Sequence, residues 1–135
     1  YNDNGTMMYS VDGFQIDIKG KGSHGAYPQN SIDPINIGVH DYLALEAIMA
    51  REINPTKACV MTVGQFQGGT AENIIPDVAT LKEQSEVMIT GKRAYGPQNE
   101  RGCNKDSRSY GGTAEITMLS EVPPLICDPN LQMNL

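Results

Sequence analysis

The clearest pattern in the chain is a strict alternation of apolar and polar residues over positions 14–19, Phe-Gln-Ile-Asp-Ile-Lys. Successive side chains of a strand point to opposite faces, so this period of two predicts a strand with one buried face. A run rich in β-forming residues follows at 57–66, with apolar residues on both faces. Further strands are predicted at about 77–88 and at 113–120.

A helix is predicted to begin at Asp33-Pro34 and to run to about Ile53. The Asp33 carboxylate can accept hydrogen bonds from the first turn, where the missing N–H of Pro34 removes no helical hydrogen bond. A helical wheel predicts a broad apolar face toward the sheet, interrupted by Glu46; its members are Ile35, Val39, Tyr42, Leu43, Leu45, Met49 and Ile53. A second, narrower apolar stripe suggests a partner helix; it consists of Ile37, Ala44 and Ile48.

The predicted elements follow the order strand, helix, strand, strand, helix, strand. This order is typical of an α+β, ferredoxin-like βαββαβ fold, with a four-stranded antiparallel sheet and two helices on one face. The second helix should lie within 91–112, although glycines and a proline weaken its pattern. We expect a single domain over 1–135 with a core at about 13–120, and linkers at 1–12 and 121–135.

Composition narrows the possible functions. The formal net charge is -6 and the ten Lys and Arg residues are scattered, which argues against nucleic-acid or anionic-membrane binding. No apolar run reaches the roughly 20 residues of a membrane helix and no signal peptide is recognisable, so we expect a soluble, cytoplasmic protein. The three cysteines form no C-x-x-C pair, which excludes a cysteine zinc motif. The first residue, Tyr1, is not Met, and we expect a piece of a longer protein.

Positions 20–25, Gly-Lys-Gly-Ser-His-Gly, match the G-x-G-x-x-G pattern of dinucleotide-binding loops. In a Rossmann unit the helix begins at the motif itself, whereas the helix predicted here begins near Asp33. The context therefore argues against nucleotide binding.

The same residues carry a more specific resemblance. Residues 18–28 (Ile-Lys-Gly-Lys-Gly-Ser-His-Gly-Ala-Tyr-Pro), 62–77 (Thr-Val-Gly-Gln-Phe-Gln-Gly-Gly-Thr-Ala-Glu-Asn-Ile-Ile-Pro-Asp) and 111–115 with 122–125 resemble the lid, or dimerisation, domain of the aminoacylase, hippurate hydrolase and auxin-conjugate hydrolase family. The resemblance covers nearly the whole chain except 83–109. It implies a metal-dependent amidohydrolase that cleaves N-acyl amino acids or small peptides, with two divalent metals, usually zinc, in a separate catalytic domain. This chain has two histidines and no ligand cluster, so we expect no metal site and no other cofactor in it.

The resemblance also implies roles for two residues. The histidine matching His24 reaches into the active site of the partner subunit and donates a hydrogen bond to the oxygen of the scissile carbonyl. Asn73 matches a substrate-contacting asparagine. From the residue types alone, a surface-loop histidine is the favoured interpretation of His24, and a turn residue is the commoner role for Asn73; the family resemblance reverses the preference at His24. His40 is predicted to be a surface or interface histidine with no catalytic role.

One position departs from the family pattern. Where the family commonly carries an arginine that binds the substrate carboxylate, the aligned residue is Glu86. A carboxylate cannot bind another carboxylate in this way.

The predicted partners are a second copy of the same chain, bound through the first helix and the 57–66 strand, and a small N-acyl amino acid or peptide. The alternative is a stand-alone ferredoxin-like interaction or regulatory module without catalytic activity.

Overall fold

The computed structural model of the chain describes residues 6–87 and 107–126. Its main sheet has four long antiparallel strands in the order β4-β6-β2-β7, which are β2 (Ser10–Lys19), β4 (Cys59–Gly68), β6 (Val78–Val87) and β7 (Thr113–Val122). The four predicted strands and the ferredoxin-like α+β fold are confirmed. The sheet extends a few residues beyond the expected core of 13–120, and the roles of the flanks as linkers stay predictions.

The alternation in β2 separates the two faces of the sheet. Ile16 and Ile18 are fully buried on the face beneath the helix. Asp17 lies on the other face, where it accepts hydrogen bonds from Gln15 Nε2 (2.8 Å) and Thr80 Oγ1 (2.7 Å). The face opposite the helix is therefore polar and hydrogen-bonded, as expected for a sheet with one solvated side.

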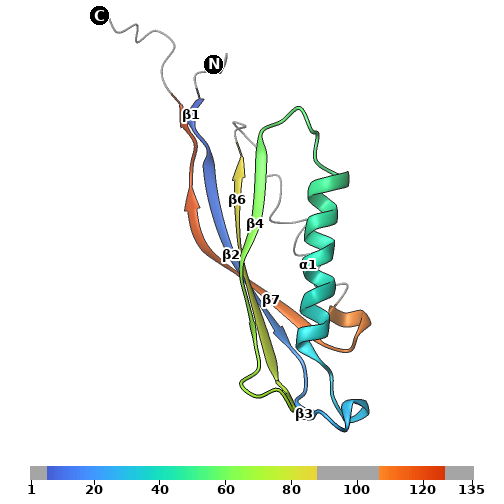
Figure 1. Cartoon of the computed structure of the whole chain (residues 1–135). Helices are drawn as coiled ribbons and strands as arrows, with labels where there is room; N and C mark the ends of the chain where they lie inside the picture. Colours follow the sequence, from blue (N-terminus) through green and yellow to red (C-terminus); the bar gives the residue numbers. More distant parts are fainter. Residues whose placement is uncertain (1–5, 88–106, 127–135) are drawn as a thin grey trace, which may run out of the picture.

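Helix α1 (Pro34–Arg51) covers one face of this sheet, as Figure 1 shows. Asp33 caps it as predicted, because its Oδ1 accepts hydrogen bonds from the N–H groups of Ile35 (2.9 Å) and Asn36 (3.2 Å). The central core lies between the helix and the sheet, and its buried members are Ile16, Ile18, Ile37, Leu45, Met61 and Leu81.

The predicted rotation of the helix was wrong. Ile37 and Ile48, assigned to a partner-facing stripe, are buried against the sheet, whereas Val39 and Leu43 are 44% and 57% exposed. Glu46 does not intrude on the core, because it is exposed, and the buried carboxylate of α1 is Asp41. The helix is apolar on more than one side, so its periodicity could not decide which apolar side packs on the sheet.

Most of the predicted second helix at 91–112 lies outside the described residues. Residues 107–109 are helical, and Ser107 Oγ donates a hydrogen bond to Asp41 Oδ2 at 3.4 Å. Both residues are fully buried. This contact places the helical turn on the same face of the sheet as α1.

Two small ribbons lie at opposite ends of the molecule in Figure 1. At the upper end, β1 (Thr6–Met8) pairs with β8 (Leu125–Ile126). At the lower end, β3 (Ser23–His24) pairs with β5 (Ile74–Ile75), and a short 3-10 helix, η1 (Pro28–Asn30), follows β3. The residues singled out by the family resemblance lie at this lower end.

Candidate functional site

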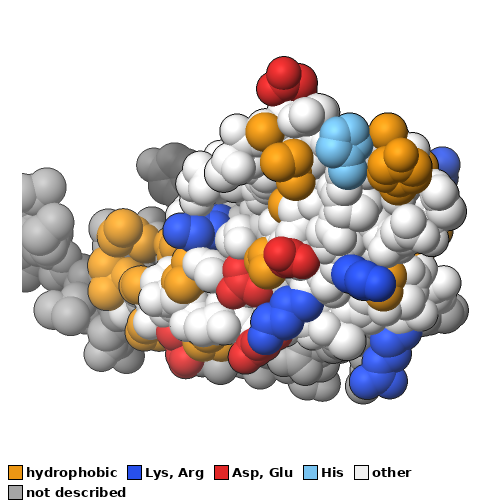
Figure 2. Space-filling view, turned by 90° about the horizontal axis from the view of Figure 1, so that it is seen from below, with side chains coloured by type: hydrophobic (Ala, Val, Ile, Leu, Met, Phe, Trp, Pro, Cys, Tyr) orange, Lys and Arg blue, Asp and Glu red, His pale blue; other side chains and the backbone are white. Residues whose placement is uncertain are grey.

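The β3–β5 ribbon brings the two sequence-predicted site residues together. His24 is the Cα partner of Ile74, and the N–H of Gly25 donates to the carbonyl oxygen of Asn73 at 2.7 Å. Both His24 and Asn73 are exposed. Figure 2 looks onto this end of the molecule, where a histidine side chain lies at the surface beside hydrophobic side chains. Two residues far apart in the sequence therefore form one exposed site.

A tight turn after β3 fixes the hydrogen bonding of the imidazole. The N–H of Tyr27 donates to the His24 carbonyl oxygen at 2.9 Å, which closes the turn. Within the turn, the N–H of Ala26 donates to Nδ1 of His24 at 3.1 Å. An Nδ1 that accepts a hydrogen bond carries no proton, so the neutral ring holds its proton on Nε2. His24 can therefore present an N–H donor to a ligand.

The glycines of the G-x-G-x-x-G pattern allow close backbone packing in this loop. A Cβ added at Gly20 would lie 2.1 Å from the carbonyl oxygen of Ile32. A Cβ added at Gly22 would lie 2.8 Å from the carbonyl oxygen of Ile75, and one added at Gly25 would lie 3.1 Å from that of Asn73. A single turn of 3-10 helix follows the motif, and α1 begins only at Pro34. This geometry does not support the dinucleotide alternative, which needs a helix starting at the motif.

Asp77 holds the loop in place from the start of β6. Its backbone oxygen accepts a hydrogen bond from the N–H of Gly20 at 2.8 Å, and its Oδ1 accepts one from the N–H of Gly22 at 2.8 Å. This role of Asp77 was not predicted from the sequence, although Asp77 lies within the second motif that carries the family resemblance.

A hollow of about 560 Å³ lies beside Gly25, between the chain leaving β4 and the start of α1. Its lining includes Asp33, Gly69, Thr70 and Glu72. Backbone groups and polar side chains thus surround a space beside Gly25, the residue that follows His24. The space is open to one side, as a site completed by another surface would be.

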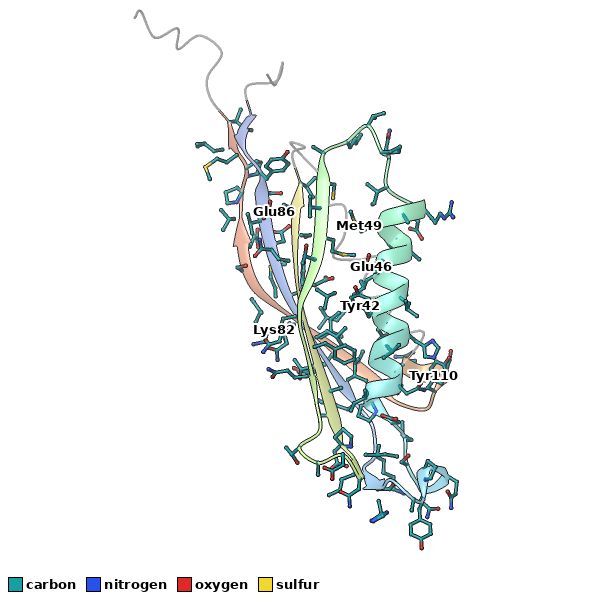
Figure 3. All side chains as sticks on the ribbon, in the orientation of Figure 1. Tyr42, Glu46, Met49, Lys82, Glu86 and Tyr110 are labelled. Carbon is teal, nitrogen blue, oxygen red and sulfur yellow. The ribbon has the colours of Figure 1, made fainter. Side chains whose placement is uncertain are left out.

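The remaining candidate residues lie elsewhere. Glu86 is on the face of β6 turned away from α1 and accepts a hydrogen bond from Gln84 Nε2 at 2.9 Å (Figure 3). His40 stacks on Tyr110, with ring centroids 4.8 Å apart and Nε2 3.2 Å from the Tyr110 hydroxyl. His40 therefore has a surface packing role, at a position separate from the β3–β5 ribbon.

The described part of the chain holds neither a cluster of metal-ligand side chains nor a membrane-spanning helix. Within residues 6–87 and 107–126, no group of three or more His, Cys, Asp or Glu side chains is arranged to hold a metal ion. No helix in those ranges is long and apolar enough to cross a membrane.

The sequence of the chain matches the model of a known protein family. The model of the peptidase dimerisation domain, found in the M20 peptidases, matches residues 8–83, which include β2, α1, β4 and the whole β3–β5 ribbon. The chain belongs to the peptidase dimerisation domain family. The resemblance noted in the sequence is thereby confirmed.

Curated relatives of this dimerisation domain are hydrolases. An N-acyl-L-amino acid amidohydrolase of Geobacillus stearothermophilus is 44% identical over 83% of this chain and 30% of its own. An N-acetyl-L-cysteine deacetylase of Bacillus subtilis is 33% identical over 92% of this chain and 30% of its own. The hippurate hydrolase of Campylobacter jejuni is 40% identical over 61% of this chain and 21% of its own. The chain thus spans less than a third of each of these enzymes.

Solved structures agree with these relatives. A dinuclear metal-binding peptidase of the M20 family from Bacillus subtilis superposes with a TM-score of 0.71 at 26% identity, over 95% of this chain and 30% of that one. An aminobenzoyl-glutamate utilization protein from Klebsiella pneumoniae gives a TM-score of 0.78 at 18% identity, over 93% of this chain and 32% of that one. At this low identity the similarity supports the fold alone. The three curated relatives and the M20 peptidase structure support the amidohydrolase hypothesis and give no support to a stand-alone regulatory module.

Proposed function

We propose that this dimerisation domain is part of a metal-dependent amidohydrolase that cleaves the amide bond of N-acyl amino acids or small peptides. In this proposal the domain joins two subunits, and it supplies His24 and Asn73 to the active site of the partner subunit. The relatives named above act on substrates of this class, which supports the assignment.

The observation that carries the proposal is the proximity of His24 and Asn73 at the end of the β3–β5 ribbon, where His24 pairs with Ile74 and the Gly25 N–H donates to the Asn73 carbonyl oxygen. Attack of water on an amide places negative charge on the carbonyl oxygen, and a fixed N–H donor lowers the energy of that state. His24 offers such a donor, because its Nδ1 is occupied by the Ala26 N–H and its Nε2 carries the proton. The Asn73 amide can both donate and accept hydrogen bonds with the amide groups of a substrate.

The described residues do not fit a metal site, because they bring no set of ligands together. In the proposed enzyme the metals lie in the separate catalytic domain that the family resemblance implies, and the dinuclear metal-binding peptidase among the solved relatives supports this. What this domain contributes is an electrostatic contact to the reacting carbonyl and a hydrogen-bonding contact to the substrate.

The test uses the full-length enzyme with His24→Ala. Loss of one fixed donor to a developing oxyanion lowers kcat by about 10²–10³-fold, so we expect a fall of that size with a smaller change in KM. His40→Ala is the matched control, since His40 packs on Tyr110 away from the ribbon. Turnover of His24→Ala equal to that of His40→Ala would remove His24 from the mechanism.

We further propose that the subunits pair through α1 and β4. In the described sheet β4 is an edge strand, and edge strands need pairing or cover. The neighbouring helix exposes Val39 and Leu43, with Tyr42 and Glu46 along the adjoining flank (Figure 3). A two-fold axis beside this edge would pair the same surface of two copies.

Sedimentation velocity tests this interface. Leu43 is 57% exposed, so Leu43→Lys should leave the fold intact and convert a dimer to a monomer. Val122→Lys places the same charge at a 51% exposed residue of β7, on the opposite edge of the sheet, and should remain dimeric. A Leu43→Lys variant that sediments as the wild-type dimer would place the interface elsewhere.

A further inference from the structure

A second hollow, of about 470 Å³, lies in the part of the sheet made by β2, β4, β6 and β7. All four strands contribute to it, and its lining residues are Gly13, Thr62, Gly64, Gln65, Lys82, Glu83, Gln84, Leu119 and Ser120. Figure 3 shows Lys82 and Glu86 projecting from the side of the sheet away from α1. The hollow is lined by residues of the four long strands, whereas His24 and Asn73 lie at the β3–β5 ribbon, which is at the lower end of the molecule in Figure 1.

Missing side chains and irregular pairing create this hollow. Gly64 has open space where a Cβ would be, and the pairing of β4 with β6 shifts between Val63 and Gln65. On the other side, the pairing of β2 with β7 shifts at Gly13, where the Ser120 hydroxyl lies 2.6 Å from the position of an added Cβ. Bulges of this kind redirect side chains and are frequent beside binding sites.

Lys82 is the cation of the hollow. It is half-buried on the face opposite α1, and its partners in the ladder are Gln15 and Gln65, both neutral. Within residues 6–87 and 107–126, Lys82 makes no hydrogen bond or ion pair, whereas Lys19 binds Glu115 at 2.7 Å. The polar lining residues on the same face as Lys82 are uncharged, and an ammonium group among uncharged donors favours an anionic ligand.

Two carboxylates on this face of the sheet accept hydrogen bonds from neutral side chains and none from Lys82. Asp17 accepts from Gln15 Nε2 and Thr80 Oγ1, and Glu86 accepts from Gln84 Nε2. The side chain of Glu83 is buried on the α1 face of the sheet. Lys82 is therefore available to a ligand from outside.

We propose that this hollow binds the carboxylate group of a small organic acid, with Lys82 as its cation. Thr62, Gln65 and Ser120 provide uncharged hydrogen-bond donors around it, and Leu119, which is 52% exposed, offers an apolar contact at the rim. An N-acyl amino acid carries both a carboxylate and an apolar group. That identification of the ligand rests on the proposed function, whereas the carboxylate site itself rests on the geometry of the sheet.

The probe is N-acetylglycine, titrated into the full 135-residue chain and followed by the backbone amide shifts of Gly13 and Gly64. N-acetylglycinamide, which lacks the charge, is the control ligand. We expect saturable shifts with the acid and none with the amide. Lys82→Met should weaken binding at least about tenfold, the effect of losing one charge-assisted contact, and Lys82→Arg should retain it.

One control variant and one space-filling variant complete the test. Lys57→Met removes an exposed lysine of the loop before β4 and should bind as the wild type does. Gly64→Val places a side chain where the structure has open space, and it should weaken binding while Lys82 is still present. Equal binding of acid and amide, or unchanged binding in both Lys82→Met and Gly64→Val, would overturn the site. His24→Ala should bind N-acetylglycine normally, so failure of this inference and failure of the proposed function are distinguishable.

Discussion

Alanine substitution at Gly20 and at Gly64 should have opposite effects on stability. Neither glycine has a positive φ, so alanine fits both backbones and reduces the freedom of the unfolded chain, a gain of about 0.4–1 kcal/mol. At Gly64 nothing lies within 4 Å of the added Cβ. At Gly20 the Cβ would lie 2.1 Å from the backbone oxygen of Ile32 and 2.9 Å from Cδ of Pro34. Because the carbonyl is part of the backbone, the chain must move to relieve that contact.

The size of the difference follows from these distances. Overpacking in a well-packed region costs about 1–3 kcal/mol, and the 2.1 Å contact belongs at the upper end of that range. The gain from the unfolded chain is common to both variants, so Gly64→Ala should exceed Gly20→Ala in unfolding free energy by about 3 kcal/mol. Urea unfolding monitored by far-UV circular dichroism measures this, since the chain contains no tryptophan. Equal midpoints for the two variants would refute the steric explanation of the motif.

Three further substitutions test the fold. Asp33→Ala removes the N-cap that accepts two N–H groups at 2.9 and 3.2 Å, and should cost about 1 kcal/mol in urea unfolding, whereas Asp33→Asn should cost less. Leu45→Ala empties a site that is 1% exposed and should cost about 2–5 kcal/mol; a smaller loss would mean that α1 packs loosely. The hydrogen bond and charge of Glu115 raise the pKa of Lys19 above 10.5, so this pair's contribution is complete at neutral pH and is lost only as pH rises through the folded pKa. Glu115→Gln should therefore leave the slope of stability against pH between 6 and 8 unchanged, which thermal unfolding at several pH values can measure.

The sequence predicted the elements that depend on local signals. The alternation at 14–19 identified β2, and Asp33-Pro34 identified the start of α1, because capping and strand periodicity act within a few residues. The rotation of α1 depends on docking, which places Ile37 and Ile48 on the sheet and leaves Leu43 outside. When a helix has apolar residues on several sides, its own sequence gives no local signal for which side packs on the sheet.

Strand β4 shows how a non-local feature changes which residues share a face. Up to Val63, alternate residues of β4 face α1. The shift at Gly64 then sends Phe66 to the same face, where its ring packs against Gly38 of α1. Strict alternation from Val63 would have placed Phe66 on the opposite face. A bulge depends on the partner strand as well as on its own sequence, so a reading of 57–66 alone could not include it.

The two candidate sites also differ in how much of each could be predicted from local sequence. His24 and Asn73 could be named from sequence because each lies in a motif, yet the hydrogen bond from Ala26 that fixes the proton on Nε2 follows from the turn after β3. No sequence motif identified the hollow that contains Lys82, because Gly13, Gly64 and Lys82 meet only when the strands align. If the hollow binds carboxylates, β6 carries a carboxylate contact at Lys82, four residues before the position where the family carries an arginine and on the same face of the strand. That contact is separate from the site at His24, and the comparison of Lys82→Met with Lys57→Met tests whether Lys82 makes it.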